Sequence, residues 1–403
     1  MSVQIRYLSG TLKHDCEPVV DVDPSWLVVS PQYIALWIQA HEPLIHLLAV
    51  RRVDPAASTT VAPQVTEVLV HDPQTSLIDR LDGTRQQLHA PELRGYVLNV
   101  QPPHENACTA CYNLIGDGDG GLFLYYRGFY PIGVNYADHH EQQTCNVLLS
   151  YDGVHFHRPS LGLFEGASDD APGVAQNTIW QGYEAHNFCA FVDENPAIDP
   201  AARFKAVGGG GHDRLFGFQS DDGLRWDRVQ EDPLQIKGAF DSVNVPMWDG
   251  HVGCYRLFSR YFEEIDGQRI RAIQSCTSED FINWSEPVPH QYADGVPLEQ
   301  FYTNATVACP GAEHILLSFP MRFMPNRTLD TEGMDYPGEG LSDAVFMSSR
   351  DGVQWDRRFR QAWLRPGRDP RNWTHRNQTT AVGIIDKLVG KRQHTTDQAE
   401  PPV

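Results

Sequence analysis

Acidic residues recur at one structural place along the chain, directly before apolar runs that are typical of β-strands. Glu105 precedes the first such run, Asp241 the third and Glu299 the fourth. Glycosyl transfer to water needs such a set, because one carboxylic acid protonates the leaving oxygen while a second carboxylate activates water or attacks the anomeric carbon. A third acid nearby can raise the donor's pKa by like-charge repulsion. We predict Asp241 and Glu299 as the catalytic pair and Glu105 as the third member, although any single acid could equally cap exposed amides or pair with a lysine.

Further polar residues stand near the same strand ends and could hold a sugar. Arginine binds hydroxyls, carboxylates or neighbouring acids, and asparagine inside a strand is otherwise unfavourable. The candidate substrate-binding residues are Arg127, Glu184, His186, Asn187, Asn244, Asn304 and Arg322. A structural ion pair is the competing interpretation for each arginine. The acid/base chemistry requires no cofactor and no metal ligand is predicted, while a structural Ca²⁺ in a central channel remains compatible with the sequence.

The elements that would position these residues are indicated by a repeat. A seven-residue pattern, Ser-x-Asp-x-x-x-aromatic, occurs four times, beginning at Ser150, Ser220, Ser278 and Ser349. In each copy the Asp can cap turn amides, while the aromatic ring fills the gap between neighbouring sheets. Repetition of one unit at this period predicts an array of similar supersecondary units.

One unit can be followed strand by strand from Phe240 to Trp284. Its apolar runs are Val243–Trp248, Val252–Phe258 and Ile270–Cys276. They are separated by Asp249-Gly250 and Asp266-Gly267, which predict two-residue hairpins because both residue types tolerate positive φ. Such a unit is a four-stranded antiparallel sheet of the kind that forms a propeller blade.

We therefore predict an all-β fold, a five-bladed β-propeller of four-stranded antiparallel sheets. The fifth sheet would combine Thr379–Ile385 with early strands near 68–88, and its shortage of further strands predicts that the last blade is incomplete. The expected domains are an N-terminal extension of unassigned role (1–64), the propeller (65–386) and a polar tail (387–403).

The composition of the chain limits the classes of partner that it can bind. The formal net charge of −20 argues against nucleic-acid or anionic-membrane surfaces, since phosphates would be repelled. The N-terminus lacks the compact apolar core of a signal peptide, so the cytoplasm is the expected location, and the scattered cysteines are expected to be reduced. The sequence does not indicate an oligomeric state.

Several short motifs resemble those of bacterial five-bladed propeller proteins described as glycoside-hydrolase-like, similar to the clan of glycoside hydrolase families 32 and 43. They are Tyr125-Tyr126-Arg127-Gly128, His186-Asn187-Phe188, Asp193-Glu194-Asn195-Pro196, Arg203-Phe204-Lys205-Ala206, Gly238-Ala239-Phe240-Asp241-Ser242, Tyr302-Thr303-Asn304-Ala305 and Arg365-Pro366-Gly367. The resemblance spans about residues 66–385 and implies a carbohydrate-active hydrolase, a glycosidase in carbohydrate metabolism or polysaccharide degradation, with a carboxylate trio at Glu105, Asp241 and Glu299. The chain lacks the Trp-x-Asn-Asp-Pro motif of the fructosidases, and its first acid is Glu instead of Asp.

Two other functions fit the same pattern. A polysaccharide lyase on a propeller would need a base and an arginine that neutralises a uronate, roles that His186, Tyr302 and Arg322 could supply. A non-catalytic carbohydrate-binding propeller would use the same funnel without releasing product.

Overall fold

The computed structural model describes residues 88, 91, 96–106, 108–130, 142–210, 214–293, 295–297, 299–327, 340–365 and 378–385, and the backbone of 2–8, 34–35 and 47–53. Within these ranges the regular structure is β-strand, apart from two single-turn 3₁₀ helices, η4 (Tyr183–Ala185) and η5 (Pro200–Ala202). A search of the same ranges for an apolar helix of membrane-spanning length finds none. The all-β prediction is confirmed.

Three of the sheets are regular four-stranded antiparallel units in which the strands follow one another in chain order. The first contains β4 (Ala110–Gly116), β5 (Leu122–Arg127), β6 (Thr144–Ser150) and β7 (Thr178–Gln181). The second contains β8 (Cys189–Val192), β9 (Phe204–Gly208), β10 (Phe216–Ser220) and β11 (Asp227–Arg228). The third contains β12 (Val245–Asp249), β13 (Cys254–Ile265), β14 (Gln268–Ser278) and β15 (Val288–Pro289). We number these sheets as blades 1 to 3.

Blade 4 is split into two short sheets by breaks in its long strands. One part orders β18 (Thr306–Cys309), β19 (Ala312–Ser318), β22 (Met347–Ser349) and β23 (Gln354–Asp356), with β16 (Gln291–Tyr292) added parallel to β23. The other part orders β17 (Gln300–Thr303), β20 (Met321–Met324) and β21 (Leu341–Ala344). Each strand of the second part continues into a strand of the first after a short break.

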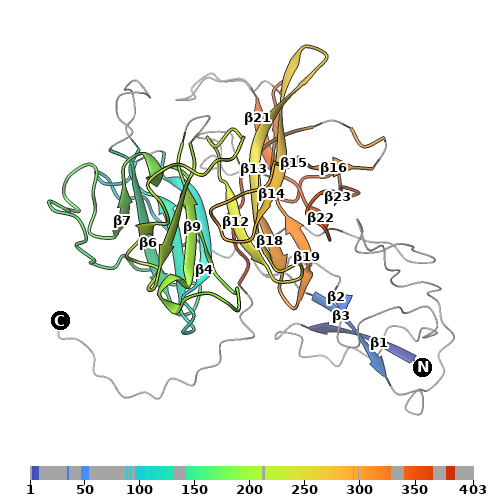
Figure 1. Ribbon diagram of the computed structural model, residues 1–403, viewed down its shortest axis with the longest axis horizontal. Helices are drawn as coiled ribbons and strands as arrows, with labels where there is room; N and C mark the ends of the chain where they lie inside the picture. Colours follow the sequence, from blue (N-terminus) through green and yellow to red (C-terminus); the bar gives the residue numbers. More distant parts are fainter. Residues whose placement is uncertain are drawn as a thin grey trace.

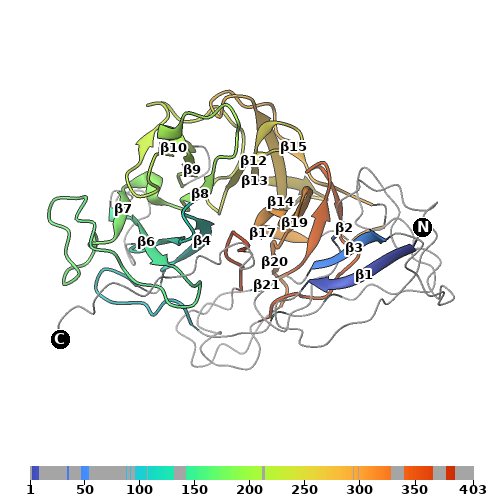
Figure 2. The same cartoon turned by 90° about the horizontal axis from the view of Figure 1, so that it is seen from below.

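The four blades fan around a common centre, with β4, β8 and β12 near it (Figure 2). These innermost strands contact one another in turn, β4 with β8 and β8 with β12, and β12 contacts β18 of blade 4. Buried apolar side chains fill the spaces between successive blades, including Tyr125 of blade 1 beside Phe188 and Trp226 of blade 2, and Phe258 of blade 3 beside Trp355 of blade 4. This is the packing of a β-propeller.

The segment expected to begin a fifth blade lies between blade 4 and blade 1. Val382 forms a parallel bridge to Asn113 of β4, with backbone hydrogen bonds to Tyr112 and Leu114 of 2.9 and 2.7 Å. The hydroxyl of Thr380 donates to the carbonyl of Phe319 in blade 4 at 3.1 Å. Innermost strands of neighbouring blades run in the same direction, so these contacts fit an inner strand in the fifth position. Its expected partners at 68–87 lie outside the described residues.

The four repeated motifs form one and the same turn. In the blade 2 copy the Ser220 hydroxyl accepts the amide of Gly223 at 2.9 Å, and Asp222 Oδ1 accepts the amides of Leu224 and Arg225, both at 2.7 Å. The copies that begin at Ser150, Ser278 and Ser349 have the same three kinds of bond. The turn geometry predicted from the repeat is confirmed.

The third copy holds a bulky residue where the others have glycine. Phe281 has a φ of 67°, against 68° for Gly153, 74° for Gly223 and 75° for Gly352. Side chains other than glycine avoid this left-handed region. The Phe281 ring is completely buried, with Phe191 of blade 2 at 5.8 Å and Tyr255 of blade 3 at 5.3 Å between ring centroids.

The β13–β14 hairpin is longer than predicted. Asp266 and Gly267 form the expected two-residue turn, both with positive φ, but the paired strands extend seven residues beyond Phe258, the predicted end of the run, to Ile265. The hairpin tip projects beyond the rest of blade 3 (Figure 1). The Asp249-Gly250 prediction is wrong in length, because four residues, 250–253, separate β12 from β13.

The N-terminal extension contributes a separate three-stranded antiparallel sheet. Its order is β1 (Ser2–Leu8), β3 (Leu47–Val53) and β2 (Ile34–Ala35). The polar tail, 387–403, lies outside the described residues.

Candidate active site

Asp241 lies just before β12, at the end of the blades where the innermost strands begin. Its side chain is 34% exposed, and its Oδ1 is 3.2 Å from Nε2 of the buried His186, which follows η4 of blade 2. On its other side Oδ2 is 3.8 Å from a guanidinium nitrogen of Arg260 on β13. His186 is held in turn by Gln143 of blade 1, whose Oε1 is 2.7 Å from Nδ1. Residues of three blades therefore meet at one accessible carboxylate.

The turn that carries Asp241 is shaped by Asn244. The amide of this fully buried side chain donates to the carbonyls of Phe240 and Ser242, at 3.0 and 2.9 Å, on either side of Asp241. The backbone amide of Ala239 donates to the carbonyl of Arg260 at 2.8 Å. Asn244, predicted to bind sugar hydroxyls, instead uses its amide group to fix the backbone around the carboxylate.

Cys111 and Asn187 meet beside this carboxylate, and both have left-handed backbone conformations, with φ of 60° and 54°. The Cys111 thiol donates to Asn187 Oδ1 at 2.8 Å, joining blade 1 to blade 2. Burial raises the pKa of the Cys111 thiol, with the charges of Arg127 and Asp241 acting on it in opposite directions. Non-glycine residues in this region of φ store strain of about 1–3 kcal/mol each and gather at functional sites.

Arg127 lies at the same end of blade 1. Its Nε donates to the carbonyl of Cys108 at 3.0 Å, and its guanidinium is 5.0 Å from the ring centre of Tyr130, which in turn is 5.9 Å from the His186 ring. Arg127 is thus connected to the Asp241 site through Tyr130 and His186.

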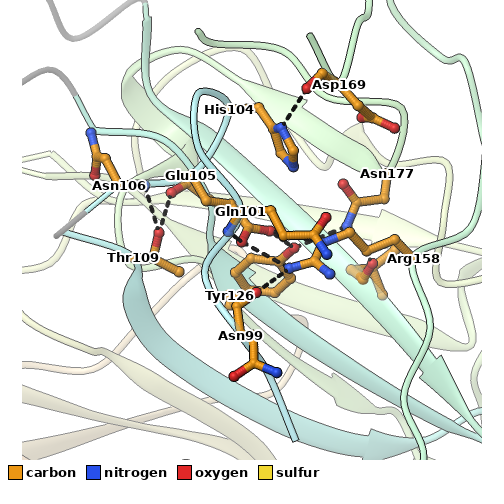
Figure 3. Close-up of polar contacts among 12 residues, drawn as sticks. Asn99, Gln101, His104, Glu105, Asn106, Thr109, Tyr126, Arg158, Asp169 and Asn177 are labelled. Atoms are coloured by element: carbon orange, nitrogen blue, oxygen red, sulfur yellow. Dashed lines mark hydrogen bonds and ion pairs between the residues drawn. The ribbon is translucent and has the colours of Figure 1, made fainter. Parts of the chain in front are cut away.

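Glu105 is placed elsewhere. Its side chain has 0% exposure and is bound by Arg158 and by Tyr126 on β5 (Figure 3). Tyr126 donates to Oε1 at 2.5 Å, Arg158 donates to both oxygens at 3.1 and 2.8 Å, and the amide of Gln101 adds a fourth bond of 2.8 Å. Burial, followed by the nearby Glu105 charge, raises the pKa of Tyr126 well above its usual range. No described contact joins Glu105 to Asp241 or Glu299, and this closed network leaves it no access to a substrate.

Glu299 and Arg322 belong to an ion-pair network in blade 4. Glu299, 25% exposed, contacts Arg322 at 2.8 Å and also pairs with Arg357. Arg322 makes two further bonds, of 2.9 and 2.8 Å, to Asp343 on the neighbouring strand. For Arg322 the structural ion pair, which the sequence left open, is what the structure shows.

The remaining predicted residues, Glu184 and Asn304, are bound to neighbouring groups of the fold. Glu184 pairs with Arg228 of its own blade, and its other oxygen is 3.5 Å from the indole nitrogen of Trp180. Asn304 is buried, and its amide donates to the carbonyl of Phe258 at 3.4 Å. The structure thus gathers Asp241, His186, Asn187 and Arg127 with Asn244 beneath, and directs Glu105, Glu184 and Arg322 into ion pairs.

Three residues at the site were missed from the sequence, namely Cys111, Tyr130 and Gln143. Tyr130 and Gln143 belong to connections, and no local pattern distinguishes them from ordinary loop residues. Cys111 lies in an apolar run, where a free cysteine is expected to behave as a small buried hydrophobe, and its contact with Asn187 joins residues 76 positions apart. In the described part of the chain no group of three or more His, Cys, Asp and Glu side chains is arranged to hold a metal ion.

Comparisons with known proteins give fold-level likeness only. No protein-family model matches the chain, and no curated protein matches it. Similar solved structures include an N-acetylgalactosamine deacetylase from F. plautii, at 15% identity and a TM-score of 0.42 over 69% of this chain and 75% of that one. A β-fructofuranosidase from Schwanniomyces occidentalis matches at 15% identity and 0.40, over 63% of this chain and 46% of that one. A putative glycosidase from Bacteroides thetaiotaomicron matches at 17% identity and 0.38, over 65% and 75%.

These neighbours are carbohydrate-active proteins, the kind that the sequence motifs resemble. With every TM-score below 0.5, the likeness carries no argument about what this chain does. The all-β blade architecture rests on the chain's own strand pairing.

Proposed function

We propose that the protein is a glycoside hydrolase that cleaves an oligosaccharide or polysaccharide at the carboxylate of Asp241. One observation carries the proposal. Asp241 is a partly exposed acid fixed by a buried histidine and faced by a buried arginine, at the point where the innermost strands of three blades begin. A carboxylate that is held in place and still reaches solvent can act on a sugar at the propeller centre.

Hydrogen-bond chemistry favours a role for Asp241 as base or nucleophile. Nε2 of His186 lies 3.2 Å from Asp241 Oδ1, and Nδ1 lies 2.7 Å from Gln143 Oε1. A proton on Nε2 lets the ring donate to the carboxylate, and such a hydrogen bond favours the ionised form of Asp241. The positive charge of Arg260 also favours the ionised form of the Asp241 carboxylate. His186 and Arg260 are therefore positioning residues for Asp241.

Glu299 is the second carboxylate of the proposal. Its case is weaker than that of Asp241, because Arg322 and Arg357 already bind both of its oxygens. Glu299 would have to release one of these partners in order to protonate a leaving oxygen. Glu105, which is closed off from solvent, has no catalytic role in the proposal.

The test is product release from a panel of glycans by the full-length protein. The wild type is expected to release new reducing ends from at least one glycan, and Asp241→Asn to lose this activity. Glu286→Gln, which alters an exposed acid paired with Lys237 on blade 3, is the matched control and should retain it. Full turnover by Asp241→Asn would remove Asp241 from the mechanism, and binding without any product would favour a carbohydrate-binding propeller.

A polysaccharide lyase is the second candidate, and the surroundings of Tyr302 favour it. The ring centre of Tyr302 is 4.7 Å from the guanidinium of Arg260 and 5.3 Å from that of Arg271. A lyase needs a base beside cations that neutralise a uronate, and these two arginines replace Arg322, whose guanidinium is committed to Asp343 and Glu299. Elimination leaves a double bond that absorbs ultraviolet light, whereas hydrolysis does not, so the absorbance of the products separates the two reactions.

A further inference from the structure

The projecting β13–β14 hairpin carries positive charge on one face. Directly opposed residues of an antiparallel pair share a face, as do residues two apart on one strand. Phe262 opposes Arg271 and Glu264 opposes Arg269, while Arg260 stands two residues before Phe262. Three arginines therefore share a face with one acid, Glu264, and both strands of the hairpin contact β17 of blade 4.

Aromatic rings hold these arginines in place. The guanidinium of Arg269 is 3.7 Å from the ring centre of Phe262, and that of Arg260 is 5.0 Å from it. Arg271 is 5.0 Å from the ring centre of Phe323, and Tyr302 lies next to both Arg260 and Arg271. A guanidinium stacked on a ring is fixed in orientation and keeps its N–H edge for a ligand. We call Arg260, Arg269 and Arg271, with Phe262, Tyr302 and Phe323, the arginine platform.

The described neighbours of the platform leave donors unused. Arg260 is 2% exposed, yet its Nε has no hydrogen-bond partner within the described residues, and the same holds for the buried Nε of Arg271. Arg271 donates once, from Nη1 to Gln300 Oε1 at 3.0 Å. Buried nitrogen donors without acceptors are unfavourable, and a guanidinium is more so because it is charged.

The positive charges of the platform also exceed the negative charges next to it. Among the described residues one carboxylate, Asp241, lies within 4 Å of a platform arginine, at 3.8 Å from Arg260. Burial lowers the pKa of Arg271, Tyr302 and Asp241 oppose this shift, and the neighbouring charges of Arg260 and Arg269 add to it. A bound anion would supply both the missing acceptors and the missing negative charge. In a chain with a formal net charge of −20, this cationic surface is the exception.

We propose that the arginine platform binds an anionic group on the carbohydrate, a uronate carboxylate or a sulfate ester, and so selects acidic glycans. Guanidinium groups pair with either group through two parallel hydrogen bonds, while Tyr302 offers a ring against which a sugar can lie. Because Arg260 contacts Asp241, the acidic group would lie next to the carboxylate that reacts. The inference rests on the proposed function only in taking the ligand to be a sugar.

Binding is measured in the Asp241→Asn background, so that turnover does not consume the ligand. The probes are galacturonate oligosaccharides, sulfated galactose oligosaccharides and uncharged galactose oligosaccharides of equal length, titrated by calorimetry. One of the two acidic classes should bind at least about tenfold more tightly than the uncharged class, and which one does so identifies the group. Adding salt should weaken acidic binding alone, because the charges are partly exposed.

The variants are Arg271→Gln and the exposed Arg269→Gln. Each should lower affinity for the acidic glycan by about tenfold, the range of one good charged contact, and leave the uncharged glycan unaffected. Arg225→Gln, an exposed arginine in the blade 2 turn, is the matched control. Thermal unfolding of each variant establishes that it is folded.

The inference fails if the uncharged glycan binds as tightly as both acidic ones, or if Arg271→Gln and Arg269→Gln leave acidic binding unchanged. Cleavage of uncharged glycans with no preference for acidic ones would overturn the inference and leave the proposed function standing. Arginine-dependent binding of an acidic glycan with no product from the wild type would support the inference and overturn the proposed function.

Discussion

Two carboxylates that look alike in the sequence have opposite surroundings in the structure. Glu105 is fully buried and receives four hydrogen bonds, from Tyr126, Arg158 and the backbone of Gln101. Asp241 is 34% exposed and has longer contacts, of 3.2 Å to His186 and 3.8 Å to Arg260. A buried carboxylate with both oxygens saturated by hydrogen bonds stabilises the fold, whereas one that reaches solvent beside fixed cations can bind and react. Access to solvent, and not position before a strand, separates the two roles.

Replacing Asp241 gives the largest expected effect and tests the carboxylate that reaches solvent. Asp241→Asn keeps the shape and removes the charge, so kcat/KM on a cleaved glycan should fall by about a thousandfold, within the range for loss of an acid/base group. The free energy of unfolding should fall less than in Glu105→Gln, because the Asp241 side chain is partly exposed and its contacts with His186 and Arg260 are longer. Steady-state kinetics and chemical denaturation measure both. A variant that loses stability and keeps turnover would reverse the assignment.

Replacing Glu105 tests the carboxylate whose oxygens are saturated by hydrogen bonds. Glu105→Gln leaves Arg158 without its ionic partner in a largely buried position, so the free energy of unfolding should fall by about 3 kcal/mol. Turnover per folded molecule should stay unchanged. The double variant Glu105→Gln/Arg158→Gln should lose less than the sum of the single losses, because the two residues interact. Loss of turnover without loss of stability would instead give Glu105 a catalytic role.

His290 extends the comparison to a buried group that has no hydrogen-bond partner among the described residues. Its ring stacks on Trp355 at 4.8 Å, and burial, followed by the charge of Arg256, lowers its pKa to about 3. The unfolded chain takes up a proton below about pH 6.5, while the folded chain stays neutral down to about pH 3. Stability should therefore fall as pH drops through this window, by up to about 1.4 kcal/mol per pH unit.

His290→Phe keeps the stacked ring and removes the titration. Its unfolding free energy should depend less steeply on pH between 6 and 4 than that of the wild type. Denaturation series at several pH values make the comparison, with His155→Gln, which alters an exposed histidine, as the control. Parallel curves for His290→Phe and the wild type would show that His290 titrates normally in the folded chain.

The smallest expected effect concerns the hydroxyl that binds Glu105. Tyr126→Phe removes the bond to Oε1 and a bond accepted from Asn177, whose amide keeps the carbonyl of Val147, and leaves the Arg158 bonds in place. We expect a loss of about 1.5 kcal/mol in the free energy of unfolding, the low end for a hydrogen bond to a charged group. A loss as large as that of Glu105→Gln would mean that the phenol, and not the arginine, holds the carboxylate.

The sequence predicted the fold better than the site. Ser-x-Asp turns are local, since their hydrogen bonds join residues at most three apart, and so the four blades could be recognised from short patterns. Position before a strand led to the prediction of Asp241, which the structure places beside His186 and Arg260. For Glu105 the same rule failed, because residues 99–106 fold against β5 and Arg158, which lies 53 positions away. Partners that distant have no local signature.

The arginine platform was missed for a related reason. Arg269 and Arg271 lie outside or at the edge of the run, beginning at Ile270, that was predicted as a strand, and the paired strands extend to Ile265 and Gln268. Alternation of polar and aromatic residues along this extension indicates a strand exposed on both faces, a pattern that apolar runs do not reveal. Its proximity to Tyr302 depends on the packing of blade 3 against blade 4.

Phe281 has a consequence for how the blades could be exchanged. A side chain added at Gly223 would collide with Phe123 and Tyr125 of blade 1, and one added at Gly352 with Arg256 of blade 3. At Phe281 the corresponding space is filled by the turn itself, beside Lys205 of blade 2. At these three junctions the space beside the turn is filled either by side chains of the preceding blade or by the turn's own Phe281. A blade grafted alone would bring too many bulky groups to one of its interfaces with neighbouring blades and too few to the other. A turn should therefore be transferred together with the second strand of the preceding blade.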